Sequence, residues 1–212
     1  MKINEIEKVA KELKKIQLSL HPNFQFSWNN PSLNILDCVL SLNRNYYSMV
    51  KPRLDRFKDN HPDCFSIEDL IDLFQDYKCN YGEFTVRELD YNHADRGRII
   101  FEVAEYLLKE ISKDDSGTQI EKLEKWAINA KPEDAYTTGI KGFGLAGFQY
   151  LRILFGAQTA KPDVHVINYL SNIIDRKLSN IGALNLLEKA APFTGIPIRE
   201  LDLAIWEYQS SL

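Results

Sequence analysis

Apolar residues recur every three or four positions along most of the chain, and this spacing constrains the fold more than any other feature. In the first segment Ile6, Val9, Leu13, Ile16 and Leu20 follow this interval, with charged residues between them. The pattern places apolar side chains on one face of an α-helix. Runs rich in β-branched residues, which would predict strands, are absent. We therefore expect an all-α protein.

The same segment and the cysteines indicate the cellular compartment in which this protein is expected. An amphipathic start differs from the unbroken apolar stretch of a signal peptide, and no stretch is long enough to span a membrane. Cys38, Cys64 and Cys79 are odd in number and widely separated, which argues against a disulfide framework or a zinc site. We expect a cytoplasmic protein without a membrane partner. Its oligomeric state stays open, with a monomer favoured.

The charge of the chain limits how it can meet nucleic acid. Its formal net charge is −4 over 212 residues, which argues against a protein that coats nucleic acid through bulk charge. A local basic patch remains compatible with this balance.

Prolines and capping residues mark the ends of several expected helices. Pro31 begins one helix, Ser66 caps another, and Pro52 is expected to kink the helix of residues 46–57. Residues 77–97 are polar and aromatic without a clear period, which predicts an extended loop.

A pair of glycines occurs in the connection IKGFGL. Gly142 and Gly144 can adopt backbone angles that other residues avoid, and they leave amides exposed at the start of the next helix. Exposed amides at a helix start suit a phosphate. Any tight connection between helices prefers glycine, so this feature needs its context.

That context is the helix FQYLRILFGA followed by KPDVH. The order resembles the helix-hairpin-helix and Gly/Pro…Asp signature of the endonuclease III superfamily of DNA glycosylases, over roughly residues 31–175. The resemblance implies that the hairpin holds a phosphate of duplex DNA and that Asp163 is the catalytic carboxylate at the start of a later helix. It also implies two helical lobes around a DNA-binding cleft, formed by residues 1–30 plus 161–212 and by a six-helix lobe of residues 31–160.

A carboxylate at this place suits hydrolysis of an N-glycosidic bond. Breaking the bond builds positive charge on the sugar, and an ionised Asp163 would stabilise that charge and orient the attacking water. Aspartate after proline is also a common helix N-cap, and both roles are compatible. We therefore predict a DNA glycosylase of base-excision repair that acts on double-stranded DNA and is monofunctional.

Strand cleavage would require a lysine nucleophile. Members that cleave the strand carry a lysine two residues after the second hairpin glycine, where this chain has Ala146. A lyase would then use Lys161 or Lys141, which otherwise contact phosphate or are simply solvated. A second alternative is a helix-hairpin-helix module that binds DNA without catalysis. The residues assigned to the DNA backbone are Lys141, Gly142, Phe143, Gly144 and Lys161.

A flipped base needs a wedge to fill its gap and a pocket to receive it. By the register of the family, the wedge is Asn43, with Arg44 beside it. Asp37 lies in an otherwise apolar helix, where an unpaired carboxylate is costly, so it should face the cleft, a partner or water. Cys38 occupies the position of the general acid of the adenine-excising subgroup, which argues against that chemistry. The candidates for stacking or hydrogen bonding to the base are Phe24, Phe26, Trp28, Asp37, Asn43, Tyr46, Tyr47 and His165.

No cofactor is implied, because the four-cysteine iron–sulfur loop found in the superfamily is missing. A bound cation often accompanies the hairpin of such families, so the backbone near Gly142 and Gly144 is a candidate site for a monovalent cation. The identity of the excised base is left open among alkylated, deaminated, oxidised and enzymatically modified bases.

Overall fold

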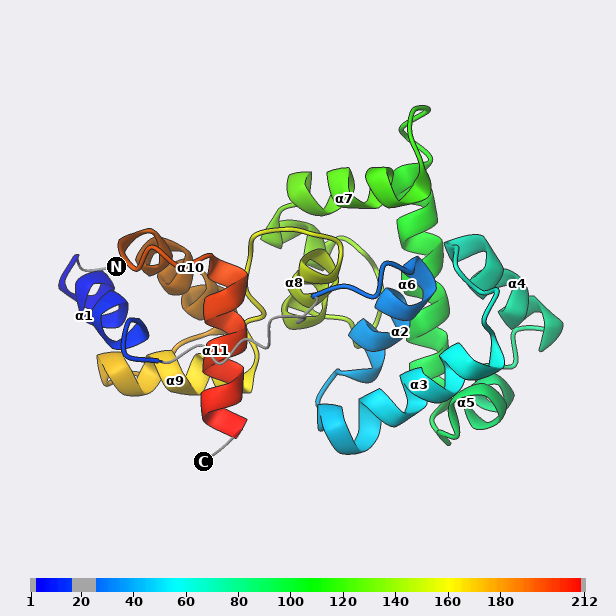
Figure 1. Ribbon diagram of the computed structural model, residues 1–212, viewed down its shortest axis with the longest axis horizontal. Coiled ribbons are helices and arrows are strands. Elements are labelled where there is room, and N and C mark those ends of the chain that lie inside the picture. The colour runs from blue at the N-terminus through cyan, green and yellow to red at the C-terminus, as the bar shows by residue number, and fades with distance from the viewer. Residues whose placement is uncertain (1–2, 17–25, 211–212) are drawn as a thin grey trace.

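The computed structural model describes residues 3–16 and 26–210, and these residues form helices without any strand (Figure 1). The predicted all-α class is therefore confirmed. None of the described helices is both long and apolar enough to cross a membrane. The α-helices are α1 (Ile3–Leu13), α2 (Pro31–Leu40), α3 (Lys51–Asn60), α4 (Ile67–Asp76), α5 (Tyr81–Leu89), α6 (Ala94–Ile111), α7 (Gln119–Asn129), α8 (Leu145–Leu154), α9 (Val164–Ile174), α10 (Asn180–Ala190) and α11 (Ile198–Ser210). The shorter elements are the π-helix η1 (Tyr46–Val50) and the 3-10 helices η2 (Pro132–Tyr136) and η3 (Ala191–Phe193).

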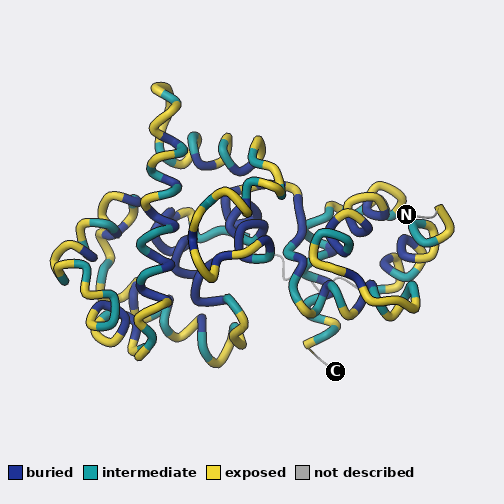
Figure 2. Tube along the Cα trace, turned by 180° about the vertical axis from the view of Figure 1, so that it is seen from behind, coloured by how far each residue is buried: buried dark blue, intermediate teal, exposed yellow. Residues whose placement is uncertain are grey.

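The helices form two lobes, each around its own hydrophobic core (Figures 1 and 2). Helices α2 to α8 supply the first core, whereas α1, α9, α10 and α11 surround the second. The first and last helices of the chain therefore lie in the same lobe. Ile181 of α10 packs against both cores, and α10 also contacts α8. The lobes thus meet along α8 and α10.

Residues 31–160 hold seven α-helices rather than the expected six, and the expected loop of residues 77–97 is wrong because it contains α5. The Asn80 side chain caps α5 by accepting the N–H of Glu83 at 3.2 Å. Phe84 is fully buried and stacks on Phe74 with ring centroids 3.6 Å apart. The capped start, together with burial of Phe84, Thr85 and Leu89, stabilises this short helix.

The prediction that Pro52 kinks a single helix of residues 46–57 is also wrong. Residues 46–50 make the π-helical turn η1, and α3 starts at Lys51 with Pro52 in its first turn. A proline has no N–H and its ring crowds the carbonyl four residues earlier, so the widened turn accommodates it. Asn45 caps η1 by accepting the N–H of Ser48 at 3.0 Å. The turn places Tyr46 and Tyr47 beside the boundary between the lobes.

Helix α8 lies at the centre of the molecule and contacts α2, α7, η2 and α10. Its polar side chains hold its neighbours in place. Arg152 donates to the carbonyl of Ala127 at 2.9 Å, and Gln149 donates to the Thr159 hydroxyl at 2.7 Å. The second of these contacts fixes the segment that leads from α8 to Asp163.

Close packing of α5 on α6 gives the first testable prediction. A Cβ atom at Gly97 would lie 2.6 Å from the backbone oxygen of Tyr81, whereas one at Gly82 would make ordinary contacts with Ala94 Cβ at 3.5 Å and Asn80 Oδ1 at 3.7 Å. We expect Gly97→Ala to lower the free energy of unfolding by about 1–3 kcal/mol, because the helices must separate. Gly82→Ala should raise it by about 0.5–1 kcal/mol through helix propensity. Urea unfolding followed by circular dichroism measures both, and equal effects would contradict the packing.

Candidate active site between the two lobes

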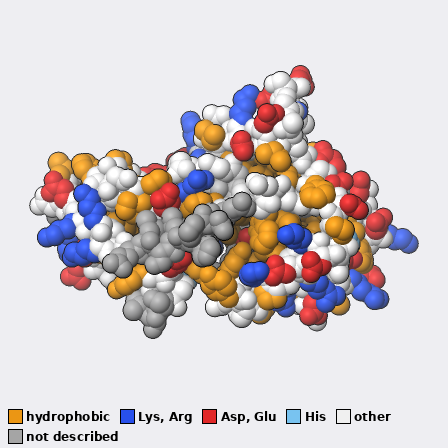
Figure 3. Space-filling model, in the orientation of Figure 1, with side chains coloured by type: hydrophobic (Ala, Val, Ile, Leu, Met, Phe, Trp, Pro, Cys, Tyr) orange, Lys and Arg blue, Asp and Glu red, His pale blue; other side chains and the backbone are white. Residues whose placement is uncertain are grey.

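A cavity of about 460 Å³ lies between the lobes. Both lobes contribute to it, through the segment before α2, α2 itself, η1, α3, α8, the residues around Asp163, and α11. Figure 3 shows hydrophobic side chains gathered around a hollow between the lobes. The aromatic residues of the lining are Phe26, Trp28, Tyr46, Tyr47, Tyr150 and Trp206. The charged residues are Asp37, Arg44, Lys58, Lys161, Asp163, Asp202 and Glu207.

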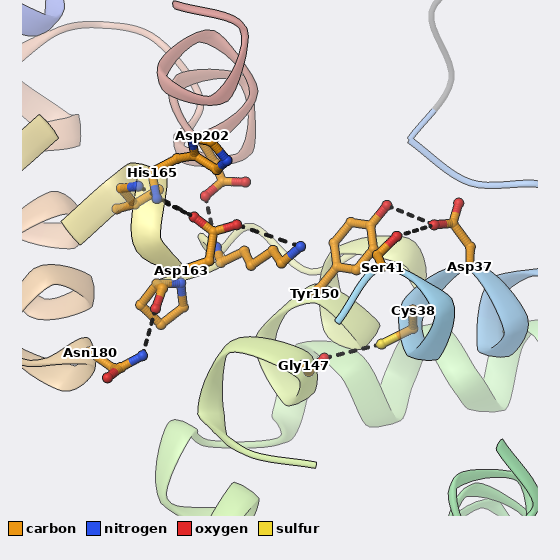
Figure 4. A network of polar contacts seen from close by, with 12 residues as sticks. Asp37, Cys38, Ser41, Gly147, Tyr150, Asp163, His165, Asn180 and Asp202 are labelled. Atoms are coloured by element: carbon orange, nitrogen blue, oxygen red, sulfur yellow. Dashed lines mark hydrogen bonds and ion pairs between the residues drawn. The ribbon is translucent and has the colours of Figure 1, made fainter. Parts of the chain in front are cut away.

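Asp163 lies in the cavity wall and is also the N-cap of α9 (Figure 4). Its Oδ1 accepts the backbone N–H of His165 at 2.9 Å and that of Val166 at 3.4 Å. Its Oδ2 lies 3.6 Å from the ammonium of Lys161. Capping therefore occupies one oxygen of the carboxylate and orients the other. The structural role of Asp163 as an N-cap is thus compatible with a chemical role.

Lys161 is held in the site rather than solvated, so the alternative of plain solvation is wrong for it. Its side chain is 16% exposed, and Nζ lies 4.5 Å from the centroid of the Tyr150 ring. Together with Asp163 this ring surrounds the amine on two sides. Lys141, by contrast, is exposed and is not among the residues that line the cavity.

Asp202 of α11 is a site residue that the sequence did not reveal. Its Oδ1 accepts the backbone N–H of Lys161 at 2.8 Å. Burial, together with the negative charge of Asp163, raises the pKa of Asp202 to about 8. The sequence signal for it is a carboxylate within the otherwise apolar stretch of residues 201–206.

Asp37 faces the cavity, as expected, and is only 2% exposed. Its Oδ1 accepts hydrogen bonds from Ser41 Oγ and from the Tyr150 hydroxyl, both at 3.1 Å (Figure 4). Its Oδ2 accepts from Trp28 Nε1 at 2.8 Å and from the Tyr46 hydroxyl at 3.5 Å. Burial raises the pKa of Asp37, and the hydrogen bonds from Trp28, Ser41 and Tyr150 oppose the rise. The carboxyl thus fixes three aromatic side chains of the cavity wall.

The other predicted pocket residues divide into two groups. Arg44 and Tyr47 line the cavity, and the Tyr47 ring lies 5.9 Å from that of Trp206 across the boundary between the lobes. Asn43 and His165 do not line it; Asn43 is exposed with a φ of 54°, which suits a turn residue. Phe24 lies outside the described residues.

Cys38 is not among the residues that line the cavity. Its thiol is fully buried and points to the carbonyl of Gly147 at 3.2 Å, and burial raises its pKa.

The glycine connection lies at the start of α8, outside the cavity lining. Gly142 has a φ of 88°, and both Gly142 and Gly144 are exposed. Phe143 as a whole residue is only 3% exposed, so it offers almost no surface to DNA. The preceding element is the 3-10 helix η2 rather than an α-helix, because Lys131 before Pro132 is extended and ends helical geometry.

The hairpin does not fit the monovalent cation suggested by the resemblance. The Arg98 guanidinium donates to the carbonyl of Lys141 at 2.9 Å, and the carbonyl of Ile140 accepts the N–H of Phe143. The positive charge of Arg98 at the Lys141 carbonyl disfavours a second cation at that oxygen. Within the described residues there is also no cluster of three or more histidine, cysteine, aspartate or glutamate side chains suited to a metal.

Fold and cavity together define an all-helical protein of two lobes with a carboxylate-bearing site between them. Residues 4–210 match the family described as "Domain of unknown function (DUF8548)", and the chain belongs to that family. Comparison with curated proteins and comparison with solved structures each gave no match. The resemblance to DNA glycosylases therefore stays a prediction from the sequence.

The network around Asp37 gives a prediction for stability. Asp37→Ala removes the acceptor for several buried donors, so we expect a loss of about 2–4 kcal/mol in the free energy of unfolding. The matched control is Asp55→Ala, which removes an exposed ion pair with Lys51 (2.7 Å) and should cost at most about 1 kcal/mol. Urea titration followed by tryptophan fluorescence measures both variants. Similar losses for the two would show that Asp37 does not organise the wall.

Proposed function

We propose that the protein is a DNA glycosylase that takes a modified base from double-stranded DNA into the interlobe cavity and hydrolyses its N-glycosidic bond with the help of Asp163. The observation that carries the proposal is the position of Asp163. One of its oxygens is held by the first amides of α9, and the residue lines an aromatic cavity between the lobes.

The size and lining of the cavity suit a base. Its volume of about 460 Å³ falls within the range of small-ligand pockets. Trp28, Tyr46 and Tyr150 offer ring faces or edges for stacking, and Asp37 holds all three in place. A base inside a duplex is accessible to such a pocket only after it has been extruded from the stack.

The chemistry follows from the orientation of Asp163. Loss of the base leaves positive charge on the sugar, and a fixed carboxylate near that charge lowers the barrier without having to reorganise. The same carboxylate can orient a water molecule for attack on C1′. Because the N-terminal amides of α9 fix the side chain, little conformational freedom is lost when the substrate binds.

The start of α8 supports a contact with the DNA backbone. Gly144 is the N-cap of α8 and no side chain caps this helix, so its first amides remain available to a phosphate. Lys141 adds an exposed positive charge next to them. Binding would then rely on local contacts, which is compatible with a chain of net charge −4.

Excision of a base is the decisive test. Duplexes that each carry one modified base are incubated with wild type and with Asp163→Asn, and hot alkali then reveals abasic sites. Asparagine caps a helix as well as aspartate does, so the variant should fold normally, but we expect its excision rate to fall at least about 100-fold.

The control is Asp175→Asn, which makes the same charge change at the C-cap of α9, where Asp175 has a φ of 55° that asparagine tolerates. It should retain the wild-type rate. If wild type binds duplex DNA but excises none of the bases, the catalytic proposal fails and the alternative of a binding module replaces it.

A second candidate function, strand cleavage through Lys161, is favoured by the position of its amine 3.6 Å from Asp163 in the cavity. After base loss, the deprotonated amine would attack the C1′ aldehyde of the abasic sugar and release water to form an imine. Asp163 is close enough to take the proton of the ammonium. Lys141 does not line the cavity, so it has no carboxylate of the cavity beside its amine.

Borohydride reduces an imine to a stable secondary amine, so it traps the enzyme on an abasic duplex. If Lys161 is the nucleophile, wild type and Lys141→Gln should form the covalent complex and Lys161→Gln should not, as measured by denaturing gel electrophoresis. Absence of trapping in wild type would leave the monofunctional reaction as the only proposal.

A further inference from the structure

We propose that Asp202 is a second catalytic carboxyl, which gives a proton to the departing base while Asp163 acts on the sugar. This inference rests on the proposed glycosylase function. It gives Asp163 and Asp202 different catalytic roles in one cavity. It also restricts the chemical class of base that the site would remove.

The geometry places Asp202 where it can act. It lines the cavity together with Asp163, although the two residues come from different helices of the second lobe (Figure 4). Its Oδ1 is held by the backbone N–H of Lys161 at 2.8 Å. Its Oδ2 has no hydrogen-bond partner among the described residues. One oxygen is thus anchored and the other can carry a proton.

The charges around Asp202 favour its protonated form. Asp163 and Lys161 face it from the segment before α9, Tyr150 and Asp37 line the same cavity from α8 and α2, and Glu207 lies on its own helix. Tyr46, Tyr47, Arg44 and Lys58 complete the titratable lining from the first lobe. Burial and the Asp163 charge outweigh Lys161 and raise the pKa of Asp202 to about 8. At neutral pH Asp202 therefore holds a proton that an exposed aspartate has lost.

The proposed step balances as follows. The C1′–N bond breaks, and its electron pair stays on the base nitrogen system, which takes the proton from Asp202. The base leaves as a neutral molecule, and Asp202 becomes a carboxylate. Water adds its oxygen to C1′ and loses a proton to Asp163, which passes it back to Asp202. The products are the free base and an abasic sugar, and both acids return to their starting forms.

This role selects a chemical class of substrate. A base that is neutral in DNA would depart as an anion unless it is protonated, so an acid in the cavity accelerates its loss. A base that already carries a positive charge, such as an N-alkylated purine, departs as a neutral molecule without a proton. We therefore infer that the site acts on neutral modified bases, such as deaminated or oxidised ones.

The test compares wild type with Asp202→Asn under single-turnover conditions between pH 5.5 and 9.5. Asparagine keeps the acceptor for the Lys161 N–H and matches the neutral acid in charge, so the fold should persist, which thermal unfolding checks. For duplexes with uracil, hypoxanthine or 8-oxoguanine, we expect the variant to be at least about 100-fold slower than wild type. For 7-methylguanine, we expect a change smaller than about threefold.

The pH profile distinguishes a proton donor from a structural residue. Above pH 8 the wild-type rate should fall about tenfold per pH unit as Asp202 ionises, and the Asp202→Asn rate should lose that dependence. Carbon-13 NMR of the Asp202 carboxyl provides a readout without catalysis: its pKa should drop in Asp163→Asn, because a neighbouring negative charge is removed.

The outcomes separate the two proposals. If wild type excises none of the bases, the proposed function fails and Asp202 loses its role with it. If wild type excises a neutral base and Asp202→Asn keeps the same rate and pH profile, the proposed function stands and the inference about Asp202 is overturned. Excision of 7-methylguanine alone would also overturn it.

Discussion

The buried carboxyl of Asp37 is the interaction on which the rest of the site depends. It joins side chains from the segment before α2, from η1 and from α8, which are far apart in the sequence. A carboxyl that is 2% exposed is costly unless donors surround it, so the three aromatic donors are held where they are. These hydrogen bonds therefore restrict the orientations of three aromatic side chains in the cavity wall.

The helical class and most helix positions follow from the spacing of apolar residues, because each buried stripe must face a core. The same rule fails for α5, where Thr85 is fully buried and Val86 is 47% exposed. In this helix a polar side chain is buried and an apolar one is exposed, so the sequence shows no helical period of apolar residues. A π-helical turn before Pro52 also leaves no apolar signature, because it arises from steric crowding rather than from burial.

The sequence predicted part of the candidate site and missed the part that depends on long-range contacts. Asp163 was predicted as a site residue because the cap, the proline and the glycine connection are close together in the chain, and it lines the cavity. Asp202 meets Lys161 across 41 residues, and Tyr150 meets Asp37 across 113 residues. Only the packing of α11 and α8 brings these groups together. For Asp37 the sequence predicted that the carboxyl faces the cleft, a partner or water, but not which side chains donate hydrogen bonds to it.

The balance of charge in the cavity agrees with the entry of a base and not of a phosphate. Four carboxyls line it, Asp37, Asp163, Asp202 and Glu207, against the three cations Arg44, Lys58 and Lys161. Arg44 is partly engaged by the Tyr91 hydroxyl at 2.9 Å, and Lys161 by Asp163. With Asp202 protonated, at most three carboxylates face these three cations, and a phosphate inside would meet negative charge that no surplus cation offsets. The uncapped start of α8 lies outside the lining and carries no such charge. Under the proposed function, this separation would keep the DNA backbone at the surface while a single uncharged base enters the cavity.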